Sequence, residues 1–224
     1  MRKIRLSLPL ILLLPICVPF ASAQSSVDFA IGFGTAHDKA NTGGLDNADF
    51  SSCATPGAVD PSGGTCLANP SLGGFFLGLS GDVMLWKHFG IGGELNVQPA
   101  KSDYGPLQFR QEFYDFNAIA VPFNSKRAQL RFEGGVGGAH TGFSINQSAQ
   151  CVGTAVCTPE QSIPVGTSNH FQFHAGVGVS LFITEHIFIR PQFDIHIVPG
   201  FKDQFGSNFV PAGTVWLGYN FGER

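Results

Sequence analysis

Polar and ionisable side chains recur at every second position in the stretch 187–197, where Arg190, Asp194 and His196 alternate with apolar residues. A guanidinium, a carboxylate and an imidazole on one side of an extended chain can form ion pairs, exchange protons or bind a metal ion. Because successive side chains of a β-strand point to opposite faces, this period of two predicts a strand with one polar and one apolar face.

Two histidines upstream of this stretch test whether the pattern can build a metal site. His170 and His174 are about 13 Å apart on a strand at 3.3 Å per residue, so they cannot share an ion. A tight turn near Glu185 would instead place His174 opposite His196 across a hairpin. Such a pair can bind a metal ion or respond to pH, and hydrogen-bonded interior histidines are the simpler interpretation.

The same alternation predicts eight strands along the chain. They are Val27–Gly34, Gly74–Trp86, Phe89–Gln98, Phe109–Val121, Ala128–Ala139, the two arms of the hairpin within Ser168–Ile197, and Phe209–Phe221. In the fourth strand Phe109 and Phe113 would point inward together with Asp115 and Asn117, which leaves a bulge open as an explanation. Since each strand keeps a nearly continuous apolar face, the pattern predicts an all-β fold, an antiparallel, up-and-down transmembrane β-barrel covered by lipid. A soluble sandwich, or a lipocalin-like ligand carrier with its apolar faces inward, is the alternative.

The predicted connections alternate between long and short. The long ones are Thr35–Ser71, Pro99–Leu107, Phe143–Thr167 and Pro199–Gly206. Outer-membrane barrels have long outer loops and short periplasmic turns, so this asymmetry favours the membrane barrel over the soluble sandwich.

Residues 1–23 have the pattern of a secretory signal peptide, with a basic start, an apolar core and the cleavage site Ala21-Ser22-Ala23. Cleavage after Ala23 would leave residues 24–224 as an outer-membrane barrel domain. The full chain has 13 basic and 16 acidic residues; losing Arg2, Lys3 and Arg5 leaves 10 against 16. A chain this acidic has no electrostatic footprint for nucleic acid.

Export also makes disulfide bonds the expected state of the four cysteines that follow the signal peptide. Pairing Cys53 with Cys66 and Cys151 with Cys157 closes two short loops and needs no contact between distant segments. No C-x2-C spacing and no nearby histidine supports a metal site at these cysteines.

The polar faces of the strands carry charges that a barrel would turn inward. We predict a lumenal charge network of Asp82, Glu94, Arg131, Glu133, Arg190 and Asp194, with the two arginines as its cationic centres. Buried charges must pair, and the interior of an eight-stranded barrel is nearly filled by side chains, so no open pore is expected. A narrow gated ion path is the alternative use of these residues.

The chain resembles the small outer-membrane barrels of the OmpA/OmpX-like superfamily. The resemblance covers the whole chain after the signal peptide and rests on the eight alternating strands, the unequal loops and the closing Leu217-Gly218-Tyr219-Asn220-Phe221. It implies insertion into the outer membrane by the barrel-assembly machinery, which reads such a closing strand. The chain departs from the pattern because Gly222-Glu223-Arg224 follow the final phenylalanine.

The sequence predicts location and architecture better than activity. We expect a monomeric, non-enzymatic barrel without a cofactor, which contacts lipid and lipopolysaccharide and has a structural or surface-interaction role through its disulfide-bonded outer loops, whose partner the sequence does not name. A lipid A-modifying enzyme is an alternative. It would need a nucleophile and a base at the outer rim, where the candidates are His140, Ser144 and Ser168, and no acidic partner for them is identified.

Overall fold

A computed structural model describes residues 26–61, 63–147, 150–152, 156–158 and 161–222, with side chains in all of these ranges except 150–152 and 156–158. The predicted signal peptide, residues 1–23, lies outside the described residues. Among the described residues, none forms a helix with the length and apolar character needed to cross a bilayer.

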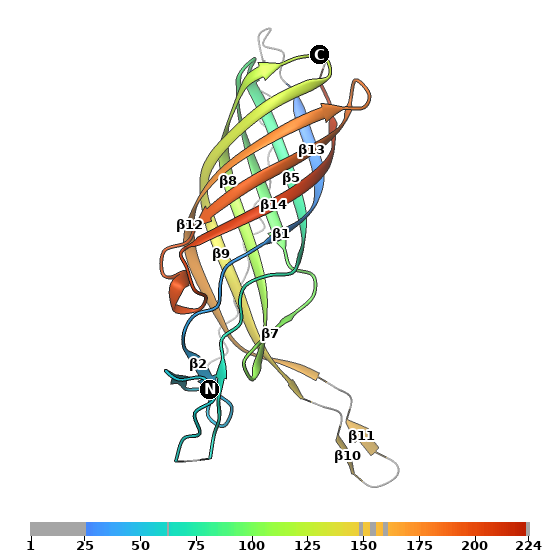
Figure 1. Cartoon of the computed structure of the whole chain (residues 1–224). Coiled ribbons are helices and arrows are strands. Elements are labelled where there is room, and N and C mark those ends of the chain that lie inside the picture. Colours follow the sequence, from blue (N-terminus) through green and yellow to red (C-terminus); the bar gives the residue numbers. More distant parts are fainter. Residues whose placement is uncertain (1–25, 62, 148–149, 153–155, 159–160, 223–224) are drawn as a thin grey trace, which may run out of the picture.

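Eight antiparallel strands form a closed barrel (Figure 1). They are β1 (Val27–Ala36), β5 (Phe75–Trp86), β6 (Phe89–Val97), β8 (Leu107–Asn124), β9 (Ala128–Gln147), β12 (Gln161–Phe182), β13 (Ile187–Ile197) and β14 (Phe209–Asn220). The pairing runs β6-β5-β1-β14-β13-β12-β9-β8 and closes where β6 pairs with β8. The predicted up-and-down barrel is therefore confirmed, because each strand pairs with its neighbour in the chain and β1 meets β14.

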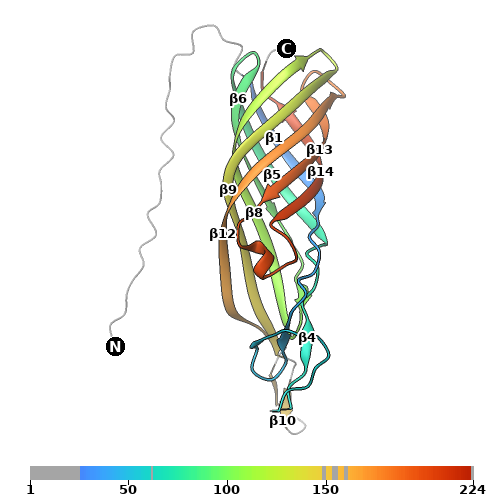
Figure 2. The same cartoon turned by 60° about the vertical axis from the view of Figure 1, so that its left-hand side comes forward.

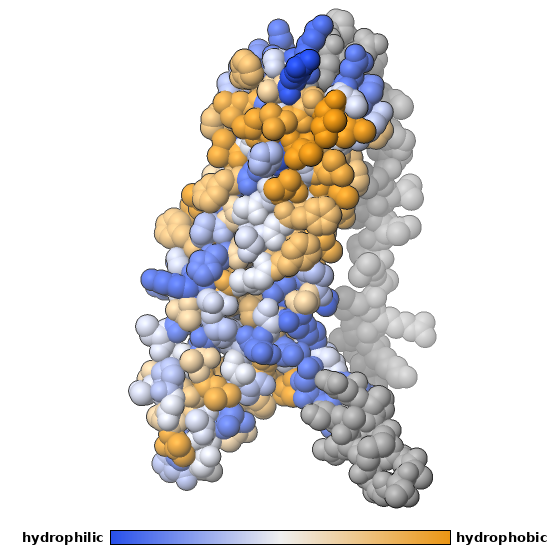
Figure 3. Space-filling view, turned by 45° about the vertical axis from the view of Figure 1, so that its right-hand side comes forward, coloured by the Kyte–Doolittle hydropathy of each residue, from blue (hydrophilic) through white to orange (hydrophobic). Residues whose placement is uncertain are grey.

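Alternation of side chains gives the barrel an apolar outside and a polar inside. In β13 the exposed residues Ile187, Ile189, Phe193 and Ile195 alternate with buried ones, Arg190 among them. Figure 3 shows the resulting apolar band on one face of the barrel wall, with hydrophilic residues beyond both edges. Exposed apolar side chains in a continuous band need lipid as their cover, so the barrel spans a membrane.

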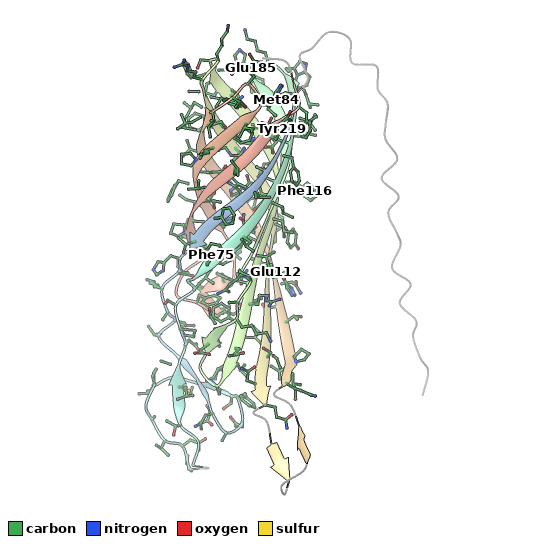
Figure 4. The ribbon with its side chains drawn as sticks, turned by 90° about the vertical axis from the view of Figure 1, so that its right-hand side faces the viewer. Phe75, Met84, Glu112, Phe116, Glu185 and Tyr219 are labelled. Carbon is green, nitrogen blue, oxygen red and sulfur yellow. A yellow bond between two sulfur atoms is a disulfide. The ribbon has the colours of Figure 1, made fainter. Side chains whose placement is uncertain are left out.

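The two ends of the barrel differ in how their strands are joined. Short turns connect β5 to β6, β8 to β9 and β12 to β13 at one end, where β1 also begins and β14 ends. Figure 4 shows Glu185 at this end, Phe116 on the wall, and Phe75 and Glu112 towards the opposite end. Because outer-membrane barrels keep short turns in the periplasm, we call this the periplasmic end and the opposite one the outer end.

The outer connections contain more regular structure than the sequence indicated. The short elements there are β2 (Gly44–Asp46), β3 (Ser52–Cys53), β4 (Cys66–Ala68), β7 (Ser102–Tyr104), β10 (Gln150–Val152), β11 (Val156–Thr158) and the 3-10 turn η1 (Phe201–Asp203). The first three form a small sheet of their own, and β7 pairs with the start of β8. The loops predicted at Thr35–Ser71 and Pro99–Leu107 are thus only partly irregular.

The third outer connection was predicted wrongly. The loop Phe143–Thr167 is mostly strand, because β9 continues to Gln147 and β12 starts at Gln161, paired from Gln161↔Gln147 onward. Beyond the lipid band both faces of a strand meet water, so alternation weakens while β-branched residues such as Ile145 and Ile163 still favour extended backbone. Strands β8, β9 and β12 project together from the barrel at the outer end (Figures 1 and 2).

Strand β8 needs no bulge near its start. Its inward residues alternate without interruption from Phe109 to Val121, and its register shifts only between Ala120 and Phe123, next to Pro122. Proline cannot donate to the ladder and is suited to such an irregular position. The inward phenylalanines have a different explanation, because they build an apolar layer inside the outer mouth, which is described below.

The apolar band makes a prediction about its outward side chains. Leu79 faces lipid between Ile31 and Leu95 of the adjacent strands, so Leu79→Arg should lower the free energy of unfolding by about 2–4 kcal/mol. Denaturant unfolding of the barrel in lipid vesicles measures this change. Val59→Arg is the matched control, because Val59 is exposed in the outer loop between β3 and β4, and it should cost little. An equal cost at both positions would contradict the membrane assignment of the band.

Candidate functional site

Arg131 lies at the centre of the buried charges inside the barrel. Its Nη1 and Nη2 donate to the two carboxylate oxygens of Asp82 at 2.6 and 2.9 Å, and its Nε donates to Glu133 at 2.9 Å. These are bidentate, charge-assisted contacts, and all three side chains are nearly inaccessible to solvent. Arg131 and Glu133 lie two residues apart on one face of β9, whereas Asp82 reaches them across the lumen from β5, which does not pair with β9.

Arg190 forms the second cationic centre on β13. Its Nη1 lies 3.4 Å from Asp82 and its Nη2 lies 3.4 Å from Glu94, while Nη2 also donates to the Ser80 hydroxyl at 3.2 Å. Its guanidinium carbon lies 5.5 Å from the ring centroid of Trp216. This arginine therefore joins the carboxylates of β5 and β6 to an aromatic layer on its other side.

Gln192 connects the remaining carboxylates. Its Nε2 lies 2.5 Å from Glu133, 3.2 Å from both oxygens of Glu94 and 2.9 Å from Asp194. The six residues predicted to form a lumenal network are thus brought together, with Gln192 as a link that the sequence did not single out. An amide group has only two protons for these four oxygens, so negative charge is concentrated around it.

The two lumenal histidines meet as the predicted hairpin requires. His174 and His196 are register partners, and their rings stack with centroids 5.0 Å apart. His174 contacts Asn117 through Nδ1 at 2.9 Å and Asp194 through Nε2 at 3.1 Å. Nδ1 of His196 has no hydrogen-bond partner among the described residues and lies 3.8 Å from Asp115.

Apolar side chains close the lumen on the periplasmic side of these charges. This inner apolar layer consists of Met84, Ile119, Val121, Phe182, Phe188 and Trp216. Glycines in the adjacent wall make room for it: a Cβ at Gly32 would lie 2.6 Å from the Trp216 ring, and one at Gly218 would clash with the ring of Phe188. The glycines of these strands are therefore needed for the fit of two large aromatic rings.

A larger apolar cluster closes the outer mouth. This outer aromatic cluster is made up of Phe76, Tyr104, Phe109, Phe113, Phe143, Phe201 and Phe205. Its rings come from the barrel wall, from β7 and from the segment that contains the turn η1, which is near the outer end of the barrel in Figure 2. The lumenal charges and the two histidines, which lie between these two apolar layers, are buried in the part of the chain with described side chains.

Tyr104 fixes the outer cluster to the β13–β14 connection. Its hydroxyl donates to the carbonyl of Gln204 at 2.6 Å, and its ring contacts Phe109, Phe143 and Phe205 at centroid distances of 5.1–5.9 Å. Burial raises the pKa of the Tyr104 hydroxyl to about 12. The second outer loop (between β6 and β8) and the fourth outer loop (between β13 and β14) are thereby connected across the mouth.

The cysteines lie in the outer connections. Cys53 and Cys66 form a disulfide bond with their Cα atoms 5.9 Å apart, which joins β3 to β4. The backbone register of β10 and β11 pairs Cys151 with Cys157. The side chains of this second pair lie outside the described residues, so its disulfide remains a prediction.

The residues weighed for an enzyme do not converge on one site. Ser168 Oγ lies 2.8 Å from Nε2 of His170, His140 contacts Asn169 at 2.6 Å, and Ser144 accepts a hydrogen bond from Lys101 at 2.8 Å. No carboxylate hydrogen bonds to His140 or His170 in the part of the chain with described side chains. Ser168 and His170 thus form a serine–histidine pair, for which the described side chains supply no hydrogen-bonded acidic partner.

Some interior residues were missed because the sequence places them on the polar face without indicating their partners. Gln172 donates a hydrogen bond to Asp115, and Asn117 contacts the ring of His174. Near the periplasmic end, Asn220 donates to Asp28. Alternation identifies all of these as inward-facing. Their contacts depend on strand order around the ring, which single strands do not encode.

Removing one cationic centre should be costly. Arg131→Met leaves Asp82 and Glu133 buried without their main partner, so the free energy of unfolding should fall by about 3–5 kcal/mol. Denaturant unfolding in detergent measures this loss. Arg127→Met is the control, since Arg127 is exposed in the adjacent turn, and adding Asp82→Asn and Glu133→Gln to Arg131→Met should recover part of the loss. A cost no larger than that of the control would disprove the ion-pair assignment.

Tyr104 makes stability sensitive to high pH. Above pH about 10 the unfolded chain loses this proton, whereas the folded chain keeps it until about pH 12, so stability must decrease over that interval. Urea unfolding at pH values on either side of 10 measures the slope. A Tyr104→Phe variant should show a shallower decrease than the unaltered chain, and identical slopes would show that Tyr104 ionises freely in the fold.

Comparison with known proteins gives a likeness of fold. No protein-family model and no curated protein matches the chain. Among solved structures, the attachment invasion locus protein Ail of Yersinia pestis is 15% identical with a TM-score of 0.47, the match covering 88% of this chain and 99% of that one. The outer membrane protein OprG of Pseudomonas aeruginosa is 15% identical with a TM-score of 0.46, covering 89% and 98%. At these scores the architecture continues to rest on the strand order and register described above.

Proposed function

We propose that the chain is an integral outer-membrane barrel with a closed interior, whose role is to hold a rigid structure outside the membrane for contact with another surface or macromolecule. The observation that carries this proposal is that the two ends of the barrel differ in how much structure their connections contain. One end has only short turns, while the other bears the β2–β3–β4 sheet, the projecting strands β8, β9 and β12, and the turn η1. The predicted signal peptide and cleavage after Ala23 are part of the proposal.

The closed interior supports a role other than transport. Ion pairs fill the middle of the lumen, and an apolar layer lies on each side of them. A permeating ion would have to cross two desolvated aromatic layers and break buried hydrogen bonds between them. A gated ion path would need both layers to move, and the hydrogen bond from Tyr104 to Gln204 opposes that movement at the outer mouth.

The outer structure has the rigidity that a contact surface needs. The Cys53–Cys66 disulfide fixes the small sheet of loop one, and the side-chain amide of Asn41 donates to the carbonyls of Lys202 and Asp203 in loop four. Lys101 binds the hydroxyls of Ser144 and Ser162, which joins loop two to β9 and β12. Preorganised loops lose less conformational entropy on binding, and so favour recognition of a partner.

Partners of the barrel wall follow from its chemistry. Acyl chains of the membrane would cover the apolar band, and lipopolysaccharide would contact the polar residues just above it. Insertion by the barrel-assembly machinery and a monomeric state belong to the same proposal. The partner of the outer loops is the part that the experiment below addresses.

A loop excision separates surface contact from a structural role. The backbone N–H of Asn69 donates to the carbonyl of Gly43 at 3.2 Å, so the two ends of this loop lie close together. A short glycine-serine linker can therefore replace residues 44–68 without moving the barrel. We expect bacteria displaying this variant to adhere poorly to cultured cell layers compared with bacteria displaying the intact chain, while detergent resistance of the envelope is unchanged. A double variant, Cys53→Ser with Cys66→Ser, is the control that keeps the loop and loses only its disulfide.

Conductance across a planar bilayer completes this test. The intact barrel should carry no stable ionic current. A steady current would refute the closed interior, and loss of envelope resistance without any change in adhesion would favour a purely structural role. Unchanged adhesion after the excision would remove loop one from the contact surface.

A further inference from the structure

The barrel interior contains more buried carboxylates than its arginines can balance. Its buried carboxylates are Asp28, Asp82, Glu94, Asp115, Glu133 and Asp194. Only Arg131 and Arg190 are buried guanidinium groups in the part of the chain with described side chains, so four carboxylates have no arginine to match them. Buried charge is costly unless it is neutralised, which raises the question of what else balances this surplus.

Asp115 and His196 each have a buried polar atom without a hydrogen-bond partner among the described residues. Asp115 Oδ1 accepts a hydrogen bond from Gln172 at 2.6 Å, but its Oδ2 has no hydrogen-bond partner among the described residues. His196 Nδ1 is also unpartnered, and the two atoms face one another at 3.8 Å. Both residues are at least nine-tenths buried, with exposed fractions of 3% and 2%. This separation is too long for a hydrogen bond.

The separation suits two ligands of one metal ion. Bonds of about 2.0–2.2 Å from a tetrahedral ion set its ligand atoms about 3.3–3.6 Å apart, close to the distance observed. Ligand atoms of Asp115, His174 and His196 all lie within 4.8 Å of one another. We propose that these three residues form a binding site for a divalent d-block cation, Zn²⁺ being the type case.

The surroundings hold Asp115 and His196 in place. The His196 ring is stacked between Phe113, with centroids 4.6 Å apart, and His174. Because a metal ion lies in the plane of each imidazole that binds it, the His174 ring must turn out of this stack to share an ion with His196. Gln172 orients the carboxylate of Asp115 from the other side. Coordination by His174 replaces one of the two hydrogen bonds that now hold its ring, to Asn117 or to Asp194, and the released group becomes an outer-shell partner.

The ligand set determines the class of ion. Two imidazoles with one carboxylate favour Zn²⁺, Co²⁺, Ni²⁺ or Cu²⁺ over Mg²⁺ and Ca²⁺, which prefer oxygen ligands. A cavity of about 10 Å³, lined by Asn96, Asp194 and His196 among others, adjoins the site and has room for about one water molecule as a fourth ligand. The bound ion would offset two of the unmatched negative charges and join β8, β12 and β13 inside the lumen.

Direct binding tests the site independently of any surface role. The full chain, produced without a histidine tag, is folded in detergent, stripped with a chelator and titrated with ZnCl₂ in a calorimeter. We expect one Zn²⁺ per chain, a higher midpoint of thermal unfolding with Zn²⁺, and the visible absorption bands of tetrahedral Co²⁺ when cobalt is used instead. Asp115→Asn and His196→Phe should each weaken binding about tenfold or more.

Matched substitutions keep the result specific. Asp28→Asn removes a lumenal carboxylate at the other end of the barrel, and His186→Phe removes an exposed histidine at the periplasmic rim. Both should bind Zn²⁺ like the unaltered chain, and heat-dependent migration in SDS gels verifies that every variant is folded. The proposal is overturned if the intact chain shows no saturable binding, or if Asp115→Asn and His196→Phe bind as tightly as the two controls.

Discussion

Desolvation of charge inside a closed ring is the constraint on which this structure depends. The guanidinium of Arg131 is buried away from water, so its N–H groups need acceptors within the protein, and the carboxylates of Asp82 and Glu133 supply them. This requirement connects strands that are distant in the sequence, because β5 and β9 lie on different parts of the ring. The ion pairs thus set the relative positions of strands whose backbone ladders alone would allow other registers.

The two apolar layers follow from the same constraint. The charges in the middle of the lumen attract one another most strongly when water is excluded, because the local dielectric constant is then low. Large aromatic rings at either end exclude the water. Trp216 occupies space left by Gly32 and Gly78, so the aromatic layer and the glycines of the wall depend on one another. On the proposed function, the interior of the barrel is a packed core rather than a passage.

Much of the barrel could be predicted from the sequence because a period of two is a local property. It determines which residues face lipid, and together with a tight turn it determines that His174 meets His196. The projecting ends of β9 and β12 could not be predicted from that pattern, because lipid no longer imposes alternation there. The role of Phe109 and Phe113 was also hidden, since inward aromatic residues violate the polar-inside rule. The structure explains them, because Tyr104 and Phe205 pack against Phe109, and Phe201 packs against Phe113.

Sealing the interior has a consequence for the outer end. Ion pairs and apolar layers stabilise the barrel from within, and the small sheet β2–β3–β4 lies outside that interior. This sheet is fixed instead by its own disulfide, Cys53–Cys66, and by hydrogen bonds to loop four. A surface stabilised separately from its support can change in sequence without endangering the fold, which is the property that a structure for contacting variable partners requires.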